Sequence, residues 1–442
     1  MKRMKWLVLI AVLAMVVAAC GDDDTTGTTA AGTTGAGGQD LAGETISVFG
    51  AFTSVEADAV NAVIEDGFNE PTGADAFYEG SESFEEQVKI RIDGGNPPDI
   101  ALYPQPGAVI EQAADGNAIA LEDLGYTVDE LEATFGSYLL SLGEYEGKHY
   151  GIPTNVNSKS IVWYNLPVFT AEGYATPATW DELVALSDQM VADGYTPWCI
   201  GTGSEAATGW PATDWMEDIM LRTAGADVYD QWVSHEIPFN DPAVLRAAGL
   251  FMDVWGNPDY VLGGAENIPD IDFRDAPDPM VADPPGCLMH RQASFIVNFF
   301  PEGTVVGEDI DLFAFPDIDP GKKAALGGGE LGAVFNDTPA VRAFIDFFIS
   351  ADTQCAMGTQ EGVSRISPNV NTSADCYADP VVATIAGALL DALRNEGMRF
   401  DASDLMPPEV GSGSFWTGMN EWMRGKATEQ VFQEIEDSWP AG

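Results

Sequence analysis

Residues 45–70 read TISVFGAFTSVEADAVNAVIEDGFNE and place a strand directly before a helix. The alternating apolar residues of Thr45–Gly50 predict a strand that ends at a glycine. Thr53 and Glu56 have the spacing of a capping box, which predicts that a helix begins there. The apolar residues that follow recur at helical intervals: Val60, Val63, Ile64 and Phe68. A strand joined to a helix in this way is the repeating unit of an α/β fold.

The same alternation continues along the chain. A second capping box at Thr179 and Glu182 predicts another helix, whereas residues 256–285, dense in Pro, Gly and Asp, predict loops. Further strands are predicted at 98–103, 160–164, 197–201, 294–299 and 311–315, and helices at 214–221, 339–350, 381–393, 415–424 and 428–439. We therefore expect an α/β protein with a largely parallel sheet. Its 442 residues suit two domains or one fold of two lobes.

The chain is strongly acidic, with 70 Asp and Glu against 19 Lys and Arg and a formal net charge of −51. A surface this negative repels phosphate backbones and anionic lipid, which argues against nucleic-acid binding by the whole protein and disfavours anionic substrates. The 45% of apolar residues separates the chain from acidic disordered proteins. One hypothesis for the charge is a habitat of high ionic strength, because salt screens the self-repulsion.

The N-terminal segment predicts export. Three basic residues precede an apolar run over residues 6–19, which is short for a membrane-spanning helix, and small residues then lead to Cys20. This pattern resembles the bacterial lipoprotein signal, in which residues 1–20 end at a cysteine that is lipidated; an ordinary signal peptide is the alternative. Removal of three basic residues and no acidic ones would take the charge from −51 to −54. Residues 21–42 predict a flexible tether.

The remaining cysteines form an even set, as expected of disulfides in an exported chain. Of three possible pairings we favour Cys199–Cys287, which lie in two apolar runs, and Cys355–Cys376, which are close in sequence. Four buried thiols are the alternative. A metal site is not predicted, because no C-x-x-C spacing occurs and the three histidines are scattered.

Catalytic signatures do not stand out in the sequence. It has no G-x-S-x-G elbow, no H-E-x-x-H and no P-loop, so we predict neither enzyme activity nor a cofactor. With 70 carboxylates, residue counts alone leave a two-carboxylate glycosidase open.

Three loop-like segments combine aromatic rings with carboxylates or amides, namely residues 205–215, 298–301 and 411–416. A flat ring can stack on the apolar face of a pyranose, and carboxylates and amides can bond its hydroxyls. Trp210 and Trp416 each follow a turn and are predicted to contact ligand, whereas Glu205 and Asp214 fit a ligand contact or a solvated surface equally well. Among apolar neighbours, the predicted core tryptophans are Trp163, Trp180 and Trp198.

Several segments, in this order, resemble the extracellular solute-binding lipoproteins of carbohydrate ABC importers, the maltose-binding-protein superfamily, and within it the α-glucoside-binding branch. The matching segments are residues 98–100, 150–164 (YGIPTNVNSKSIVWY), 179–182, 196–201, 209–215, 287–292 and 411–416. The resemblance covers essentially the whole mature chain. The resemblance implies a type II periplasmic-binding fold, with two α/β lobes around a ligand cleft and hinge crossings between them. The implied lobes are residues 43–155 with 314–345, and residues 156–313 with 346–442.

The resemblance also suggests which residues bind ligand. Trp416 matches a stacking aromatic of the family, and Phe299 or Phe300 falls where another occurs. Phe300 is a departure if the family residue there is Trp. Trp210 and the preceding Glu205 fall in a contact loop. The full expected set is Trp416, Phe299, Phe300, Trp210, Glu205, Asp214, Asp99 and Gln105, the last two at the cleft edge of the first lobe.

Taken together, the sequence predicts a substrate-binding lipoprotein of an ABC transporter. It would capture a sugar, such as an α-glucoside or another oligosaccharide, between two closing lobes and deliver it to the membrane permease. We expect a monomer, lipid-anchored to the outer face of the cytoplasmic membrane. The alternatives are a secreted carbohydrate-active hydrolase and a protein of the same fold that binds a non-sugar solute such as a polyamine.

Overall fold

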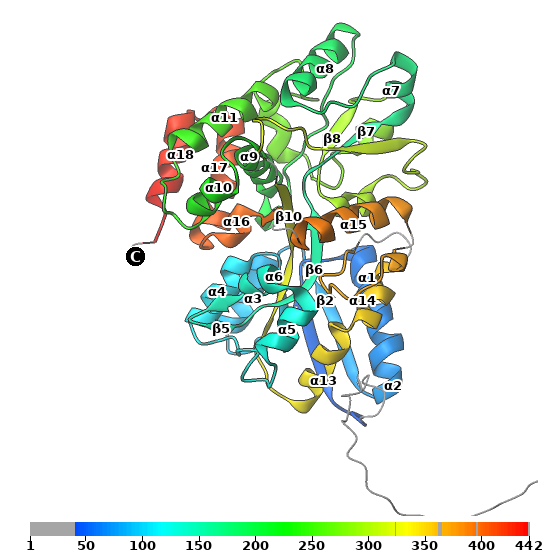
Figure 1. The fold of residues 1–442 in the computed structure, drawn as a ribbon, viewed down its shortest axis with the longest axis vertical. Coiled ribbons are helices and arrows are strands. Elements are labelled where there is room, and N and C mark those ends of the chain that lie inside the picture. The colour runs from blue at the N-terminus through cyan, green and yellow to red at the C-terminus, as the bar shows by residue number, and fades with distance from the viewer. Residues whose placement is uncertain (1–39, 323, 361–364, 378, 395–396, 441–442) are drawn as a thin grey trace, which may run out of the picture. The chain divides into compact units, whose positions relative to one another are not determined.

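A computed structural model describes residues 40–322, 324–360, 365–377, 379–394 and 397–440. The predicted signal peptide, the lipidation site Cys20 and the tether before residue 40 lie outside the described residues. Strands and helices alternate through the described ranges, which confirms the predicted α/β class (Figure 1). In these ranges, no helix is both long and apolar enough to cross a bilayer.

The larger sheet has six strands. They are β1 (Thr45–Gly50), β2 (Asp75–Gly80), β3 (Ile100–Tyr103), β6 (Ile152–Ser158), β10 (Ala325–Val334) and β11 (Met398–Phe400). β1 pairs in parallel with β2 and β3, and β10 pairs in parallel with β11. β10 is antiparallel to β3 and to β6. The sheet is therefore mixed, and the expectation of a largely parallel sheet is correct only for part of it.

The smaller sheet is antiparallel. Its order is β8 (Met289–Arg291), β7 (Ile161–Asn165) and β9 (Ile310–Ala314), and a separate hairpin joins β4 (Glu144–Tyr145) to β5 (Lys148–His149). Two predicted strands are wrong. Residues 294–299 form a 3₁₀ helix, η4 (Ser294–Phe299), and the run 197–201 makes only isolated bridges at Trp198. Short apolar runs do not distinguish these conformations from strands.

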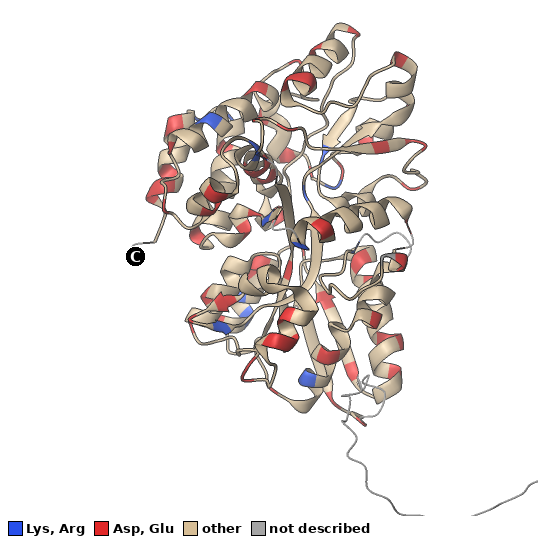
Figure 2. Ribbon diagram, in the orientation of Figure 1, with Lys and Arg blue, Asp and Glu red and all other residues tan. Residues whose placement is uncertain are grey.

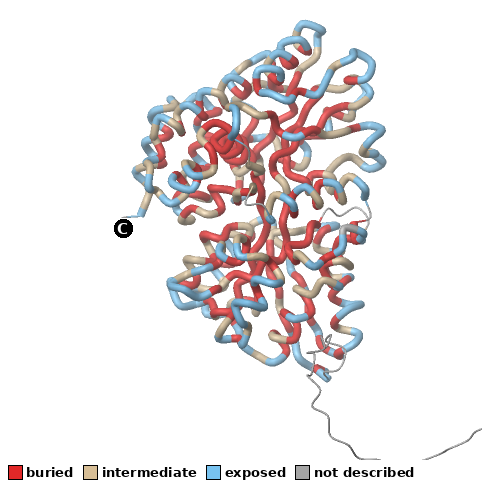
Figure 3. Tube along the Cα trace, in the orientation of Figure 1, coloured by how far each residue is buried: buried red, intermediate tan, exposed pale blue. Residues whose placement is uncertain are grey.

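Helices surround the sheets, with buried segments along the central strands and exposed outer faces (Figures 1 and 3). They are α1 (Ser54–Ile64), α2 (Glu70–Thr72), α3 (Phe84–Asp93), α4 (Pro106–Ala114), α5 (Val128–Phe135), α6 (Ser137–Ser141), α7 (Leu166–Glu172), α8 (Trp180–Ala192), α9 (Trp210–Thr223), α10 (Ala226–Val233), α11 (Pro242–Trp255), α12 (Asp278–Val281), α13 (Pro339–Phe348), α14 (Ala351–Gly358), α15 (Pro380–Arg394), α16 (Ala402–Leu405), α17 (Trp416–Met423) and α18 (Thr428–Asp437).

The two predicted capping boxes have different outcomes. Thr179 and Glu182 form both bonds of the box at the start of α8. Thr53 does precede α1, but its side chain makes no capping bond. Glu56 is buried and accepts a hydrogen bond from Asn298 Nδ2 at 2.9 Å instead. A partner 242 residues away thus replaces the local one.

Both predicted disulfides are present. Cys199 and Cys287 are joined with 5.5 Å between their Cα atoms, and Cys355 and Cys376 with 4.9 Å. The predicted core tryptophans are also buried, with Trp163 and Trp198 fully so. Acidic residues occur on most elements, and basic residues are few (Figure 2).

The chain passes from the larger sheet to the smaller one at residues 158–160. Lys159 N donates to the Leu326 carbonyl at 2.8 Å, and Ser160 Oγ accepts from Leu326 N at 2.8 Å. Asp401 N donates to the Gly327 carbonyl at 2.9 Å. Three segments distant in sequence therefore meet beside the ends of β6 and β10.

Candidate ligand-binding site

A cavity of about 930 Å³, including its open mouth, lies where these strands end. Its lining comprises Ala51, Phe52, Thr53, Glu56, Glu82, Glu85, Pro104, Gln105, Asn155, Asn157, Lys159, Ser204, Ala207, Trp210, Phe273, Arg274, Phe295, Phe299, Gly329, Glu330, Asp404 and Trp416. Segments that follow β1 and β3, strands β6 and β10, and the first turns of α9 and α17 supply most of these residues.

One side of the cavity is aromatic. The ring of Trp210 lies 5.1 Å from that of Phe273 and 5.9 Å from that of Phe295, between centroids. Phe273 in turn contacts Phe299 edge to face at 5.7 Å. Trp416 is 3% exposed, and its Nε1 donates to Ser403 Oγ at 3.1 Å. These contacts hold the rings in fixed orientations, as stacking on a ligand requires.

The cavity also contains carboxyl groups that resist ionisation. Burial raises the pKa of Glu56 to about 7, although the bond from Asn298 opposes this. Burial raises the pKa of Glu330 to about 8, which the guanidinium of Arg365 only partly offsets. The pKa of Glu85 is raised by burial too. Near neutral pH such groups can donate or accept hydrogen bonds, which suits a ligand rich in hydroxyls.

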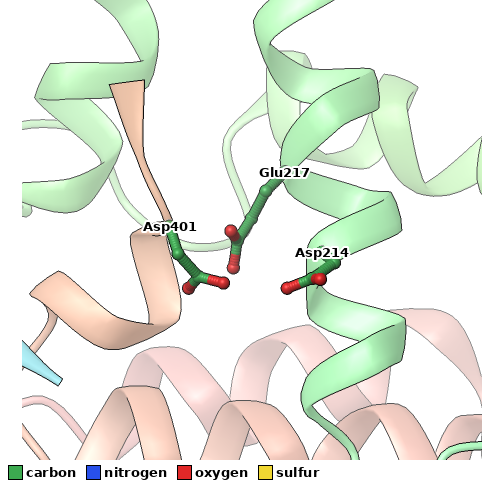
Figure 4. A group of neighbouring side chains, drawn as sticks. All are labelled: Asp214, Glu217 and Asp401. Carbon is green, nitrogen blue, oxygen red and sulfur yellow. The ribbon is translucent and has the colours of Figure 1, made fainter. Parts of the chain in front are cut away.

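A buried ionic cluster supports the far wall. Lys159 Nζ lies 2.9 Å from Asp214 Oδ1, 2.5 Å from Asp401 Oδ2 and 3.8 Å from Asp404 Oδ2. Figure 4 shows Asp214, Glu217 and Asp401 projecting toward one another, the first two from α9. Glu217 accepts from the amides of residues 402 and 403, both at 3.0 Å. The ammonium of Lys159 supplies positive charge to this group of carboxylates.

The pKa values divide these carboxylates into two kinds. Burial opposes ionisation of Asp401, but the adjacent Lys159 ammonium lowers its pKa to about 2. Burial raises the pKa of Asp214 to about 7, and with neighbouring like charges it raises those of Glu217 and Asp404 well above their ordinary values. The cluster therefore holds protons as well as ion pairs at neutral pH.

The ionic cluster continues behind the cavity. Arg291 Nη1 lies 3.3 Å from Asp214 Oδ2, and Arg291 Nη2 donates to Asp218 Oδ2 at 3.1 Å. Asp218 also pairs with Arg222 and accepts from Ser160 Oγ at 3.0 Å. The crossing segment at residues 158–160 is thus held by charges on α9 and β8.

Four residues predicted to bind ligand line the cavity. Trp210, Phe299 and Trp416 form part of its aromatic side. Gln105, just before α4, lines it as well, and its Nε2 donates to Glu85 Oε1 at 3.3 Å. The structure therefore brings together residues that are more than 300 positions apart in the sequence.

The other four lie outside the lining. The ring of Phe300 packs edge to face on the ring of the buried residue Trp163, with 5.6 Å between centroids. Glu205 is exposed at the start of a short 3₁₀ turn, with a positive φ of 50°. Asp214 lies behind Lys159 in the ionic cluster. Asp99 precedes β3, at the opposite end from Gln105, and accepts from Ser47 Oγ at 2.7 Å.

Other cavity residues escaped the sequence prediction. They are Phe52, Glu56, Asn155, Asn157, Lys159, Phe273, Arg274, Phe295, Glu330 and Asp404, among others. Several of them lie within strands. The available signal was the pair of amides at alternate positions of β6, Asn155 and Asn157, which places both on one face of the strand.

Comparison with solved structures defines the class of protein. A chitin oligosaccharide binding protein superposes with a TM-score of 0.74 at 21% identity, over 89% of this chain and 97% of that one. The solute receptor AcbH, whose structures concern a preference for b-D-galactopyranose, gives 0.74 at 18% identity over the same shares. At these identities the likeness establishes the solute-binding-protein fold alone.

Sequence comparison then identifies the family. Residues 53–354 match the family of bacterial extracellular solute-binding proteins, and the chain belongs to this family. It is 41% identical over 412 residues to the alpha-glucosides-binding periplasmic protein AglE of Rhizobium meliloti, covering 91% of this chain and 88% of that one. It is 39% identical over 374 residues to the osmoprotective compounds-binding protein GgtB of Synechocystis sp., covering 84% and 87%.

Proposed function

We propose that the protein is the solute-binding component of an ABC transporter and that it captures a sugar, in the first place an α-glucoside. The cavity carries this proposal, because Trp210 and Trp416 offer flat apolar faces beside carboxyl and amide groups. AglE, which is similar over most of its length, is named for α-glucosides, and chitin oligosaccharides are the named ligand of one solved neighbour.

Binding requires no covalent chemistry. The lining combines strands β6 and β10 of the larger sheet with the first turns of α9 and α17, so a ligand that contacts both groups could stabilise a closed arrangement of two lobes through contacts absent from the open one. The closed form would then deliver the intact sugar to the membrane permease. We also propose that a lipid on Cys20 retains the monomeric protein at the outer face of the cytoplasmic membrane.

Calorimetry against maltose, trehalose, sucrose, larger glucans and polyamines tests the proposal. We expect heat of binding with at least one glucoside and none with the polyamines. The sugar should be recovered unchanged by chromatography after long incubation. Binding of polyamines without sugars would refute the proposal, and release of smaller sugars would favour a hydrolase.

Trp416→Ala is the matching variant test. Losing the stacking surface should weaken binding of the sugar at least about tenfold, equivalent to ~1.4 kcal/mol. Trp439→Ala is the control, since Trp439 stacks on His235 outside the cavity lining and should leave affinity unchanged. Equal affinity of both variants would remove Trp416 from the binding site.

Anchoring has its own test. Cells expressing the Cys20→Ala variant should release the protein into the medium or periplasm, whereas the unaltered chain should sediment with membranes. Membrane retention of both proteins would contradict lipidation at Cys20.

A further inference from the structure

The floor of the cavity is formed by two paired strands. Glu330 of β10 lies opposite Asn155 of β6, and Gly328 lies opposite Asn157. Directly opposed residues of an antiparallel pair point to the same face, and so do residues two apart on one strand. Glu330, Asn155 and Asn157 therefore form one row of polar side chains, and all three line the cavity.

This row carries an excess of unused hydrogen-bond acceptors. Both carboxyl oxygens of Glu330 and the Oδ1 atoms of Asn155 and Asn157 are buried without a hydrogen-bond partner among the described residues. Glu330 is only 2% exposed. A buried acceptor left unsatisfied is costly, and its presence in a ligand cavity indicates the position of ligand donors.

A cation lies behind Glu330 without using its oxygens. Arg365 Nη2 is 3.6 Å from Glu330 Oε2, which is too long for a hydrogen bond. The same Nη2 donates to the Thr154 carbonyl at 3.1 Å, and the guanidinium lies over the ring of Phe52 at 5.1 Å. Arg365 is thus held in place as a counter-charge that leaves both oxygens free to accept.

The missing donors belong to hydroxyls rather than to an ammonium group. A cationic ligand at Glu330 would meet the guanidinium of Arg365 behind it. The other two cations of the lining, Lys159 and Arg274, are already paired with carboxylates. Like charges in a site of low dielectric repel strongly. Adjacent hydroxyls add no charge, and hydrogen bonds that they donate favour the ionised form of Glu330. The two oxygens of that carboxylate can then accept from both hydroxyls at once.

The absence of a side chain at Gly328 keeps the row open. A Cβ atom there would lie 2.7 Å from Lys159 Cε and 3.1 Å from Asn157 Oδ1. Any larger residue would have to displace these two side chains. The glycine therefore preserves space in front of the acceptors.

We propose that Glu330 determines specificity by accepting two hydrogen bonds from a vicinal diol of the bound sugar ring, with Asn155 and Asn157 of the neighbouring strand bonding other groups of the ligand. The inference rests on the proposed sugar binding. It predicts that the protein distinguishes rings by a pair of neighbouring hydroxyls at one end of the ligand, while Trp210 and Trp416 recognise its apolar faces.

The test measures calorimetric affinity for the glucoside that binds in the first screen and for its monodeoxy analogues. In the unaltered protein, removal of either member of one adjacent hydroxyl pair should weaken binding about 10- to 100-fold, and other positions should matter less. Glu330→Gln should weaken the parent sugar by a similar factor. Glu330→Gln should then bind each of the same two deoxy analogues less than about threefold more weakly than it binds the parent sugar.

Glu86→Gln is the control. It makes the same chemical change at a residue that is exposed on α3 and lies outside the cavity lining. Circular dichroism melting checks that each variant folds. If Glu330→Gln does not fold, the deoxy series on the unaltered protein still decides, since tolerance of every single deoxy change refutes the diol.

The outcomes also separate this inference from the proposed function. A protein that binds the sugar but shows equal losses for Glu330→Gln and Glu86→Gln overturns the role of Glu330 and leaves sugar binding intact. Tighter binding of an amino-substituted analogue than of the parent glucoside would assign Glu330 to an ammonium group and overturn the diol. Failure to bind any sugar overturns the proposed function itself.

Discussion

Lys159→Met removes the charge at the centre of the buried cluster while retaining a long apolar side chain. In the native protein the ammonium lies 2.9 Å from an Asp214 oxygen and 2.5 Å from an Asp401 oxygen, both fully buried. Burial works against the charge of Lys159, but these carboxylates outweigh it and raise its pKa well above the ordinary value. Lys159 is therefore ionised at both pH 5 and pH 8.

The expected loss follows from what the substitution leaves behind. Removing one partner of a buried ion pair typically costs about 3–5 kcal/mol, because the other charge stays uncompensated. Arg291 remains 3.3 Å from Asp214, so the lower half of that range is expected. Lys148→Met is the matched control: Lys148 pairs with Asp123 at 2.8 Å, but both side chains are about half exposed. Such surface pairs contribute about 0–1 kcal/mol.

Urea unfolding followed by circular dichroism measures both variants. At pH 8 we expect Lys159→Met to lose at least about 2 kcal/mol more than Lys148→Met. At pH 5 its loss should be smaller, because a buried carboxyl without a cation can be protonated and so lose its charge. Equal losses for the two variants, or a loss for Lys159→Met that does not vary with pH, would refute this account of the cluster.

Three further outcomes are expected. Folding raises the pKa of Glu330 from 4.5 to about 8, so the folded protein binds this proton more tightly than the unfolded chain does. The resulting contribution to the free energy of unfolding is fully present below pH 4.5 and is lost as the pH rises through 8. In Glu330→Gln, which cannot titrate at this position, the free energy of unfolding should fall less between pH 4.5 and 8 than it does in the unaltered protein. By loop length, replacing Cys199 and Cys287 with Ala should cost about 4–5 kcal/mol, and replacing Cys355 and Cys376 about 3, in urea unfolding. The melting temperature should rise with added NaCl, while calorimetric affinity for the sugar stays nearly constant; a melting temperature that is insensitive to salt would contradict the ionic-strength hypothesis.

Local sequence patterns predicted much of the fold because they depend on near neighbours. The strand at 45–50, the helix after it and the cap at Thr179 were all found from such patterns. Patterns failed where a distant partner decided the outcome. Glu56 has the spacing of a capping residue, yet its carboxyl reaches Asn298, a residue that no local pattern could bring near.

The binding site was predicted in part for the same reason. Trp210 follows a turn and begins α9, so its position could be inferred from the chain around it. The turn predicted before Trp416 is wrong, because residues 409–415 form a π-helix, η6 (Glu409–Phe415), that continues into α17. Asp214, four residues after Trp210, was also predicted to contact ligand. It lies one helical turn farther along α9, behind Lys159 and outside the cavity lining. Glu330 and Asn155 come together only through the pairing of β10 with β6, which the sequence pattern did not reveal.

The net charge of −51 combines three kinds of carboxyl group that respond to different conditions. Exposed groups repel one another through solvent and are screened by salt. Groups such as Asp401 are buried against a fixed cation and are hardly screened. Groups such as Glu330 are held near their neutral form by burial until a ligand offers donors. The first kind dominates the total charge. On the ionic-strength hypothesis the acidity of the whole chain therefore reflects its solvent, whereas the proposed diol contact makes ligand recognition depend on a few buried carboxyls in the cavity.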